Sequence, residues 1–539
     1  MQLVEQGLID LDAPMSHYLP EDFYKELGYI EPFTMRDLLN HSAGFSVNMF
    51  DNFVRVSADD LHVPELTFEE TMRKISANTH QIFSPGTGSA YSNFGVGLAG
   101  LAVEYVSGQP LYQYQREHIL NPLGMSNSAL LPDWSDNSLI LSNKAQGYLP
   151  TRNGDFRESG WLSVLNYAAG NLNASTYDMA LFGMALLEGK DNQLFINDQT
   201  LSVLFSPSYD KDDEMVGTYH GFLSMYVGDL LALGHGGNSA GFTSSLVVVP
   251  EKNFGFVFSI NGGQDHLLTE GLYDLLLQDL TTVTQPIPLI QTELPNAETV
   301  AGRYVVLDRF SYTMLEVIDY MGLISVEAIN SNTILVSRMG GQAKFIQVAP
   351  FVFELAEVIS NAPPTWRVMN RLTFGVEDGQ VYHVYVGGWD FTPLPSNRRM
   401  SILAGSLLIV VLNVLMLLIM PIVLIIKAIR RKKRKSPENK GFYSWGVATK
   451  VISLALVANN LVLFLRVATD QFGMLSGGAT IHIVLNYLFG ITVALCALFV
   501  ILSLKKGEIP HKSKVVFAIS TAITALFIIV LISWNFFTL

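Results

Sequence analysis

Residues 83–100 read FSPGTGSAYSNFGVGLAG, and this stretch does most to decide the fold. Its Pro and Gly residues predict a loop, and the apolar run that follows predicts a helix over 93–107. Tyr91 and Asn93 lie two residues apart where the loop meets the helix, so both side chains can face one cleft. A phenol whose pKa is lowered by nearby cations can act as a general base, and an Asn amide can hold a substrate carbonyl. A buried tyrosine beside an asparagine helix cap explains the same pattern without chemistry.

Around this stretch, helical patterns alternate with short apolar strands through residues 1–285. Helices come first and a group of antiparallel strands comes late, which predicts a domain of the α+β class. Its sheet is expected to pair strands from both ends of the domain, with the N-terminal strands lacking from this sequence. The expected helices are 34–40, 68–76, 93–107 and 175–188, and the expected strands are 221–227, 243–249 and 254–260.

Two further clusters carry side chains that suit chemistry. In LGHGGNSAGF, residues 233–242, glycines flank His235 at the start of a strand, so the backbone can pass close to a ligand and point N–H groups at it. An oxyanion hole needs such N–H groups; a tight turn with a solvated histidine is the alternative. In LNHSAG, residues 39–44, a helix ends in glycine, and structural capping is the favoured role of this segment, which includes His41.

The remainder of the chain divides into a β-rich module and a membrane region. Pro286–Pro295 is a proline-containing linker, and the short strands and glycine turns of 299–389 predict a small barrel or sandwich without a titratable cluster. Its expected role is packing or binding. We therefore place domains at 1–285, 286–397 and 398–539, the last with four membrane helices at about 401–426, 446–469, 479–504 and 515–537. The second helix contains Lys450, Asn459, Asn460 and Arg466, so a buried soluble helix is its alternative reading.

Charge is distributed unequally along the chain. Residues 401–539 carry 14 Lys and Arg against 3 Asp and Glu, a net +11, whereas the first 400 residues carry 20 against 45, a net −25. The basic residues gather in the loops 427–445 and 505–514, while the connection 470–478 has none. The positive-inside rule then places both basic loops in the cytoplasm of a multi-pass cell-membrane protein and residues 1–400 outside the cytoplasm.

Composition also limits the partners. The acidic first 400 residues argue against nucleic acid, which requires a basic footprint. Cys496 is the single cysteine, so neither an intrachain disulfide nor a cysteine metal site is possible. His235 has no companions at metal-ligand spacing, so we expect no metal and no other cofactor. The membrane helices make the lipid bilayer an expected partner, and the oligomeric state is left open.

In their order and spacing, these segments resemble the serine β-lactamase and penicillin-binding-protein superfamily, in its class C-like branch. The resemblance implies an incomplete β-lactamase/transpeptidase-like domain, and Ala301–Tyr304 resembles the start of a small lipocalin-like module. It further implies Tyr91 as acid/base, Asn93 as a substrate-orienting amide, and His235 with Gly237 as the third motif, with the Asn238 N–H as an oxyanion donor. Histidine in that motif leans towards the esterases and D-peptidases. The segments are LVEQGLIDLDAP (3–14), LLNHSAG (38–44), FSPGTGSAYSNFGVGLAG (83–100), VSGQPLYQY (106–114), NPLGMSNS (121–128), AAGNLNASTYDMALFG (168–183) and GHGGNSAGFTSS (234–245).

The family also uses a Ser-x-x-Lys pair for nucleophile and cation, and this pair is expected about three helical turns before Met1. Matches at 208–211 and 503–506 lie out of order and are coincidental. The sequence begins inside an amphipathic helix with no export signal, so we expect it to be truncated at its N-terminus and inactive as written, because nothing in it attacks the substrate. The function that the resemblance implies for the full-length parent is membrane-anchored, extracytoplasmic amide or ester hydrolysis through an acyl-serine, with peptidoglycan or another D-amino-acyl compound as the expected substrate. A non-catalytic ligand-binding or sensor protein on the same fold is the alternative.

Overall fold

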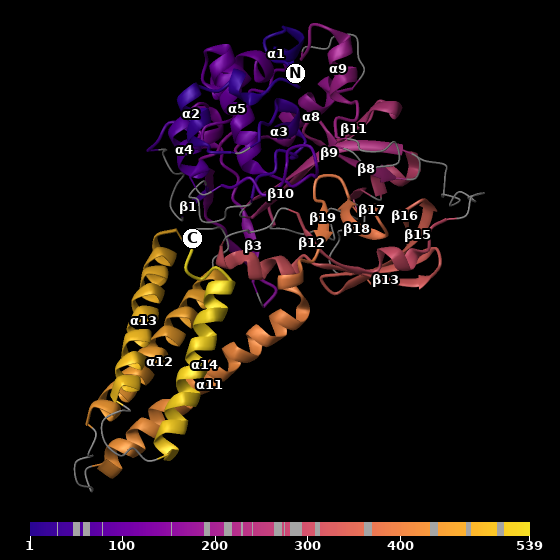
Figure 1. Ribbon diagram of the computed structural model, residues 1–539. Helices are drawn as coiled ribbons and strands as arrows, with labels where there is room; N and C mark the ends of the chain where they lie inside the picture. Colours follow the sequence, from indigo (N-terminus) through magenta and orange to yellow (C-terminus); the bar gives the residue numbers. More distant parts are fainter. Residues whose placement is uncertain are drawn as a thin grey trace. The chain divides into compact units, whose positions relative to one another are not determined.

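The computed structural model divides into two compact units, Met1–Arg309 with Asp319–Pro393, and Phe310–Ile318 with Leu394–Leu539 (Figure 1). It describes residues 1–29, 31–46, 54–57, 65–77, 79–151, 153–187, 194–209, 218–227, 230–239, 241–262, 272–273, 275–280, 294–307, 313–360, 369–431, 440–469, 476–503 and 511–538. Most of the expected linker and parts of the loops 427–445, 470–478 and 505–514 lie outside these residues.

The helices of the first unit begin at side-chain caps. Thr34 and Thr67 each form a capping box, with Asp37 in α3 (Met35–Leu39) and with Glu70 in α4 (Phe68–Ser76). Ser92 Oγ accepts the Gly95 N–H at the start of α5. The remaining helices are α1 (Gln2–Glu5), α2 (Glu21–Glu26), α5 (Asn93–Ser107), α6 (Leu111–Gln115), α7 (Ser138–Ser142), α8 (Thr176–Ala185) and α9 (Asp198–Leu204). The four helices expected from the sequence are confirmed within a few residues at each end.

An antiparallel sheet of five strands, in the order β11-β10-β9-β8-β7, carries the late part of the first unit. Helix α8 lies against β10 and β11 (Figure 1), and Leu186, Leu233 and Leu246 are buried between helix and sheet. The strands expected at 221–227, 243–249 and 254–260 are confirmed. The sheet consists of β7 (Thr218–Tyr219), β8 (Phe222–Val227), β9 (Leu230–Ser239), β10 (Phe242–Val249) and β11 (Phe254–Ile260); two-stranded pairs are β1 (Val54–Ser57) with β5 (Trp161–Val164), β2 (Ser128–Ala129) with β6 (Asn173–Ala174), and β3 (Tyr148–Pro150) with β4 (Phe156–Glu158).

The β-rich module is a closed barrel of eight antiparallel strands, in which β12 pairs with both β13 and β19. Alternate side chains fill its interior, and Phe345, Phe353 and Phe391 are fully buried there. Closure leaves no open edge for pairing with another chain. The strands are β12 (Gly302–Val306), β13 (Ile324–Asn330), β14 (Thr333–Arg338), β15 (Gly341–Ala349), β16 (Val352–Ser360), β17 (Arg371–Glu377), β18 (Gln380–Tyr385) and β19 (Phe391–Pro393).

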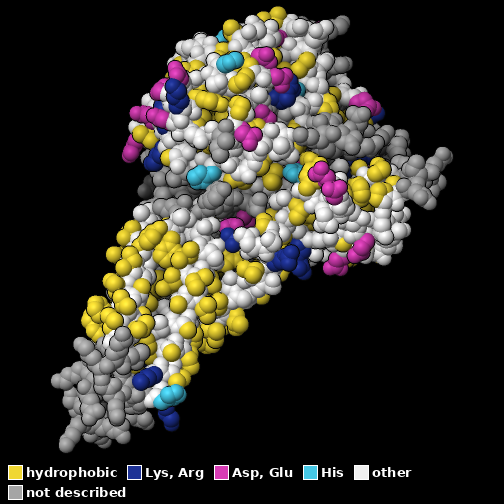
Figure 2. Space-filling model, in the orientation of Figure 1, with side chains coloured by type: hydrophobic (Ala, Val, Ile, Leu, Met, Phe, Trp, Pro, Cys, Tyr) yellow, Lys and Arg dark blue, Asp and Glu magenta, His cyan; other side chains and the backbone are white. Residues whose placement is uncertain are grey.

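The second unit contains four helices that are long and apolar enough to cross a membrane. They are α11 (Met400–Arg431), α12 (Lys440–Thr469), α13 (Ser476–Ser503) and α14 (His511–Ser533). Hydrophobic side chains cover the face of these helices seen in Figure 2, and Leu418, Ile491 and Ile529 are each about 60% exposed. Such surfaces suit lipid rather than water. Helix α14 ends four residues earlier than expected, because Trp534–Phe537 form a turn with Asn535 at φ 58°.

The asparagines of α12, which lower its hydropathy, form hydrogen bonds with other helices of the second unit. Asn486 of α13 accepts a hydrogen bond at 2.8 Å from Asn459 and another at 2.8 Å from Asn460. It also donates to the Phe536 carbonyl at 2.9 Å, and His482 Nδ1 lies 2.6 Å from Asn459 Oδ1. These contacts join α12, α13 and the segment after α14, so the asparagines serve packing between helices.

Candidate functional site

Tyr91 is held by backbone contacts on both sides of its loop. The Ala90 N–H donates to the His41 carbonyl at 2.8 Å, and Ala90 also forms an isolated antiparallel bridge with Trp389 of the barrel. Ser92 caps α5 immediately afterwards. The half-buried phenol is therefore fixed at the junction between the helical part of the first unit and the barrel.

His235 comes from β9 and meets Tyr91 across the site. The Tyr91 hydroxyl lies 3.4 Å from His235 Nε2, and His235 Nδ1 lies 2.7 Å from the Gly236 carbonyl oxygen. A carbonyl oxygen only accepts, so Nδ1 carries a proton, and in the tautomer with its one proton on Nδ1 the other nitrogen, Nε2, accepts from the Tyr91 hydroxyl. His235 itself is exposed, so this pair faces solvent from which a substrate can arrive.

The ring of His41 packs against the ring of Tyr91. His41 is 4% exposed and sits at φ 56°, and its ring centroid lies 4.3 Å from that of Tyr91. Its Nδ1 accepts the Ser92 N–H at 3.2 Å. Burial, helped by the neighbouring His235, lowers the pKa of His41 to about 3, so its ring is neutral at physiological pH. The segment expected to act as a cap thus also contacts the central tyrosine.

The electrostatic setting of Tyr91 differs from the one that a base requires. Burial raises the pKa of the Tyr91 hydroxyl above its usual value, so the group is protonated at neutral pH. Of the rings that contact it, that of His41 is neutral at physiological pH because burial lowers its pKa to about 3. A cation that lowers the pKa of Tyr91 has to come from elsewhere before Tyr91 can accept a proton.

The other predicted residues lie on the two elements that carry Tyr91 and His235. Asn93 is the first residue of α5, and its carbonyl accepts a hydrogen bond from Asn166 Nδ2 at 2.7 Å. Gly237 and Asn238 are exposed on β9. Both line a cavity of about 560 Å³, together with Trp134, Trp161 and residues of the segment 170–176. This cavity has mixed polar and apolar walls, as a site for an organic ligand does.

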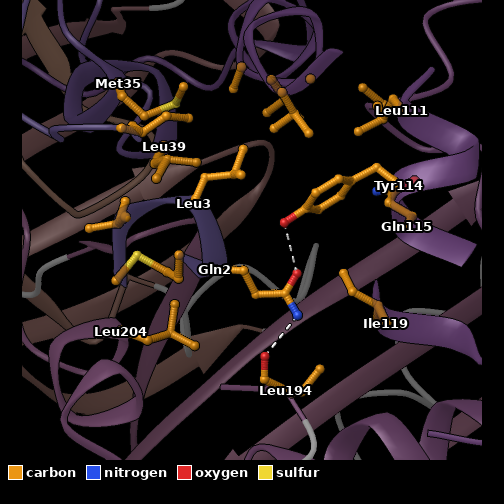
Figure 3. A pocket seen from close by; sticks show the side chains of 18 of the residues that line it. Gln2, Leu3, Met35, Leu39, Leu111, Tyr114, Gln115, Ile119, Leu194 and Leu204 are labelled. Atoms are coloured by element: carbon orange, nitrogen blue, oxygen red, sulfur yellow. Dashed lines mark hydrogen bonds between the residues drawn. The ribbon is translucent and has the colours of Figure 1, made fainter. Parts of the chain in front are cut away.

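A second cavity, of about 340 Å³, surrounds helix α1 and was not predicted from the sequence. Figure 3 shows Gln2 inside it, bonded to Tyr114 at 3.2 Å and to the Leu194 carbonyl at 2.8 Å. The rest of the lining is almost entirely apolar. Met1 is partly buried and belongs to the lining of this cavity. Its walls include Leu3, Met35, Leu39, Val96, Val103, Leu111, Ile119, Phe182 and Leu204.

The barrel contributes a residue that sequence reasoning missed. The Trp389 ring stacks on Tyr91 with centroids 5.4 Å apart and planes 20° apart. Next to Trp389, the side chains of His383 and Asp390 form a buried pair, with Nε2 and Oδ2 3.0 Å apart. The sequence Gly-Gly-Trp-Asp at 387–390 predicts a turn, and nothing in it indicates that Trp389 contacts Tyr91. Among the residues that the structure describes, no group of three or more His, Cys, Asp or Glu is placed to hold a metal.

Known proteins resemble this chain mainly in its first half. A family model described as Beta-lactamase matches residues 1–279. Beta-lactamase-like protein 2 of Dictyostelium discoideum is 26% identical over 267 residues, covering 48% of this chain and 46% of the relative. Lovastatin esterase of Penicillium rubens is 30% identical over 150 residues, 24% of this chain and 36% of the esterase. A putative D-alanyl-D-alanine carboxypeptidase of Escherichia coli K12 is 28% identical over 212 residues, 38% and 45% respectively. The chain thus spans less than half the length of each of these relatives.

Proposed function

Because the chain belongs to the beta-lactamase family, we propose that its first unit is the body of an acyl-serine hydrolase that cleaves amide or ester bonds. The observation that carries the proposal is the Tyr91 hydroxyl 3.4 Å from His235 Nε2, beside the exposed β9 backbone at 237–238. D-Amino-acyl groups of the cell wall are the proposed substrates. A relative named as a D-alanyl-D-alanine carboxypeptidase supports that choice.

Each residue has a distinct proposed role. A serine of a Ser-x-x-Lys pair preceding Met1 attacks the carbonyl carbon, and the lysine cation lowers the pKa of Tyr91. Tyr91 takes the serine proton and passes it to the leaving amine or alcohol, while the Asn238 N–H stabilises the oxyanion and Asn93 holds the substrate. Water then attacks the acyl-serine and releases the acid. While Tyr91 carries a proton, before and after it acts as the base, His235 Nε2 accepts its hydrogen bond and orients the phenol.

The apolar cavity around α1 supports the proposed position of the nucleophile. On this proposal, the helix that precedes Met1 fills part of the cavity around α1, which is lined by leucine, methionine and valine side chains. Filling that space removes apolar surface from water, which stabilises the folded state. Residues 1–539 by themselves contain no correctly ordered Ser-x-x-Lys pair, so we propose that they do not form an acyl-enzyme.

The test compares two polypeptides, residues 1–539 and the product of the gene extended upstream in frame. We expect a fluorescent penicillin to label only the extended protein, which also hydrolyses p-nitrophenyl esters. Tyr91→Phe in the extended protein is expected to lower kcat by about 10²–10⁴, whereas Tyr177→Phe, at a 70% exposed position, leaves it unchanged. An extended protein with Ser-x-x-Lys that neither labels nor hydrolyses contradicts the proposal.

A second function is favoured by the surroundings of Tyr91: burial raises the pKa of its hydroxyl, and the rings placed against it are those of His41, His235 and Trp389. On that reading, the protein binds muropeptides without cleaving them and signals or anchors through α11–α14. A stop codon directly upstream of the start, together with binding of a muropeptide by residues 1–539, supports this alternative.

We further propose that the four helices anchor the protein in the cell membrane with residues 1–400 outside the cytoplasm. The test uses a Cys496→Ala background, since Cys496 is the single cysteine. Asp378→Cys on the exposed β17–β18 turn should react with a membrane-impermeant maleimide on intact cells, and Lys512→Cys should react only after lysis. The reverse pattern overturns the orientation.

A further inference from the structure

The connection between β18 and β19, residues 386–390, reaches out of the barrel to the catalytic tyrosine. Ala90 and Trp389 are paired as neighbouring strands are, and the Asp390 N–H donates to the Ser89 carbonyl at 2.9 Å. The loop that carries Tyr91 thus continues into the barrel through backbone hydrogen bonds. Such bonds fix the relative position of two segments more tightly than side-chain contacts alone.

The buried carboxylate of Asp390 holds this connection in place through hydrogen bonds. The carboxylate is 0% exposed and accepts the Ser89 N–H at 2.8 Å, the Val386 N–H at 2.9 Å and the Gly387 N–H at 3.3 Å. His383 Nε2 lies 3.0 Å from the same carboxylate. A buried carboxylate with this many donors is satisfied and holds its neighbours in one arrangement.

The approach of the two segments leaves no room for side chains between them. A Cβ at Gly88 would lie 2.4 Å from Leu307 Cδ2 and 2.7 Å from His383 Cε1. On the other side, a Cβ at Gly388 would lie 3.0 Å from Leu223 Cδ2 of β8, and Gly388 has φ 90°. Glycine is therefore required where the barrel loop enters between the Tyr91 loop and the sheet.

The consequence is a flat aromatic surface next to the reacting groups. Trp389 stacks on Tyr91 and remains partly exposed, and Tyr91 in turn contacts the exposed His235. Trp389 and His235 both lie against the Tyr91 ring, with centroids 5.4 and 6.1 Å from it, so the indole is adjacent to any carbonyl bound between Tyr91 and His235. An indole ring at that point attracts flat or apolar groups and offers little to small polar ones.

We propose that Trp389 is a specificity-determining residue, which binds an aromatic or large apolar side chain of the substrate beside the scissile bond. The barrel thereby supplies one wall of the acyl-transfer site. This inference rests on the proposed function, and it narrows the substrate class to acyl or aminoacyl groups with such side chains.

A binding experiment tests the inference without requiring catalysis. Dissociation constants of N-acetyl-D-phenylalanine amide and N-acetyl-D-alanine amide are measured by saturation-transfer NMR on the full chain in detergent. Trp389→Ala should weaken the phenylalanine amide about three- to tenfold, the range of one aromatic stacking contact, and the alanine amide less than about twofold. Trp389→Phe should restore most of the difference, and Phe156→Ala, at a 63% exposed aromatic, should change neither constant.

The same selectivity is then measured with the upstream-extended protein on p-nitrophenyl phenylacetate and p-nitrophenyl acetate. We expect the ratio of kcat/KM to fall by a similar factor in Trp389→Ala. An equal loss for both ligands, no loss for either, or no binding of either amide by the unaltered chain overturns the inference. If the extended protein binds the amides selectively but hydrolyses no ester, the proposed function fails while the role of Trp389 stands.

Discussion

Asp390→Asn tests whether the barrel is joined to the Tyr91 loop as tightly as the structure indicates. The substitution keeps the size of the side chain but turns one acceptor oxygen into an NH₂ donor. If that donor faces the Ser89 N–H, a buried donor loses its partner, which costs about 1–3 kcal/mol. The bonds to the Val386 and Gly387 N–H groups also lose their charge assistance. We expect the contact to weaken by about 2–3 kcal/mol in total, combining these two effects.

Amide hydrogen exchange followed by mass spectrometry measures this loss directly. Peptides that cover 84–92 and 383–391 should exchange about 30- to 150-fold faster in Asp390→Asn, since each 1.4 kcal/mol is a factor of ten. The control is Asp378→Asn, on the exposed turn between β17 and β18 of the same barrel. Unchanged exchange in both peptides, with a folded variant, would refute the idea that Asp390 holds the two segments together.

Three further substitutions probe the site and the membrane helices. His41 binds its proton with a pKa of about 3 when folded and near 6.5 when unfolded, so the unfolded state takes up more protons and stability decreases as pH falls from 6.5 towards 3. At pH 5 this effect lowers the free energy of unfolding by about 2 kcal/mol, and His41→Asn should abolish it. The difference between the melting temperatures at pH 7 and pH 5 should therefore be smaller in the variant. Gly44 has φ 86°, and a Cβ there would lie 2.1 Å from the Phe83 carbonyl oxygen. Gly44→Ala should therefore lower the free energy of unfolding by about 3 kcal/mol or more, measured by thermal unfolding. The control Gly108→Ala, at a positive φ but with open space around the Cβ, should lower it by about 1–2 kcal/mol. Asn486→Leu should weaken the bundle by about 1–2 kcal/mol in a detergent titration of helicity, because it removes several interhelical hydrogen bonds.

The site was only partly predictable, for a reason visible in its residues. Tyr91 and His235 were recognisable because each lies in a short segment whose glycines, caps and strand pattern identify it. The protonation state of Tyr91 was not predictable, because its pKa depends on burial by residues distant in sequence. Trp389 could not be placed at all, since its contact with Tyr91 arises only when the barrel closes and the 386–390 connection meets the loop before α5.

The sequence by itself determined the α+β class, the positions of the main helices and strands, and the four apolar helices, because hydrophobic periodicity, capping residues and span length are local properties of the chain. Tertiary structure alone decided which side chains share a site: the neutral His41 beneath Tyr91, the proton of His235 on Nδ1, and the Asp390 anchor that brings Trp389 to the tyrosine. These depend on contacts between residues up to about 300 positions apart, and no local pattern encodes the distance between such partners.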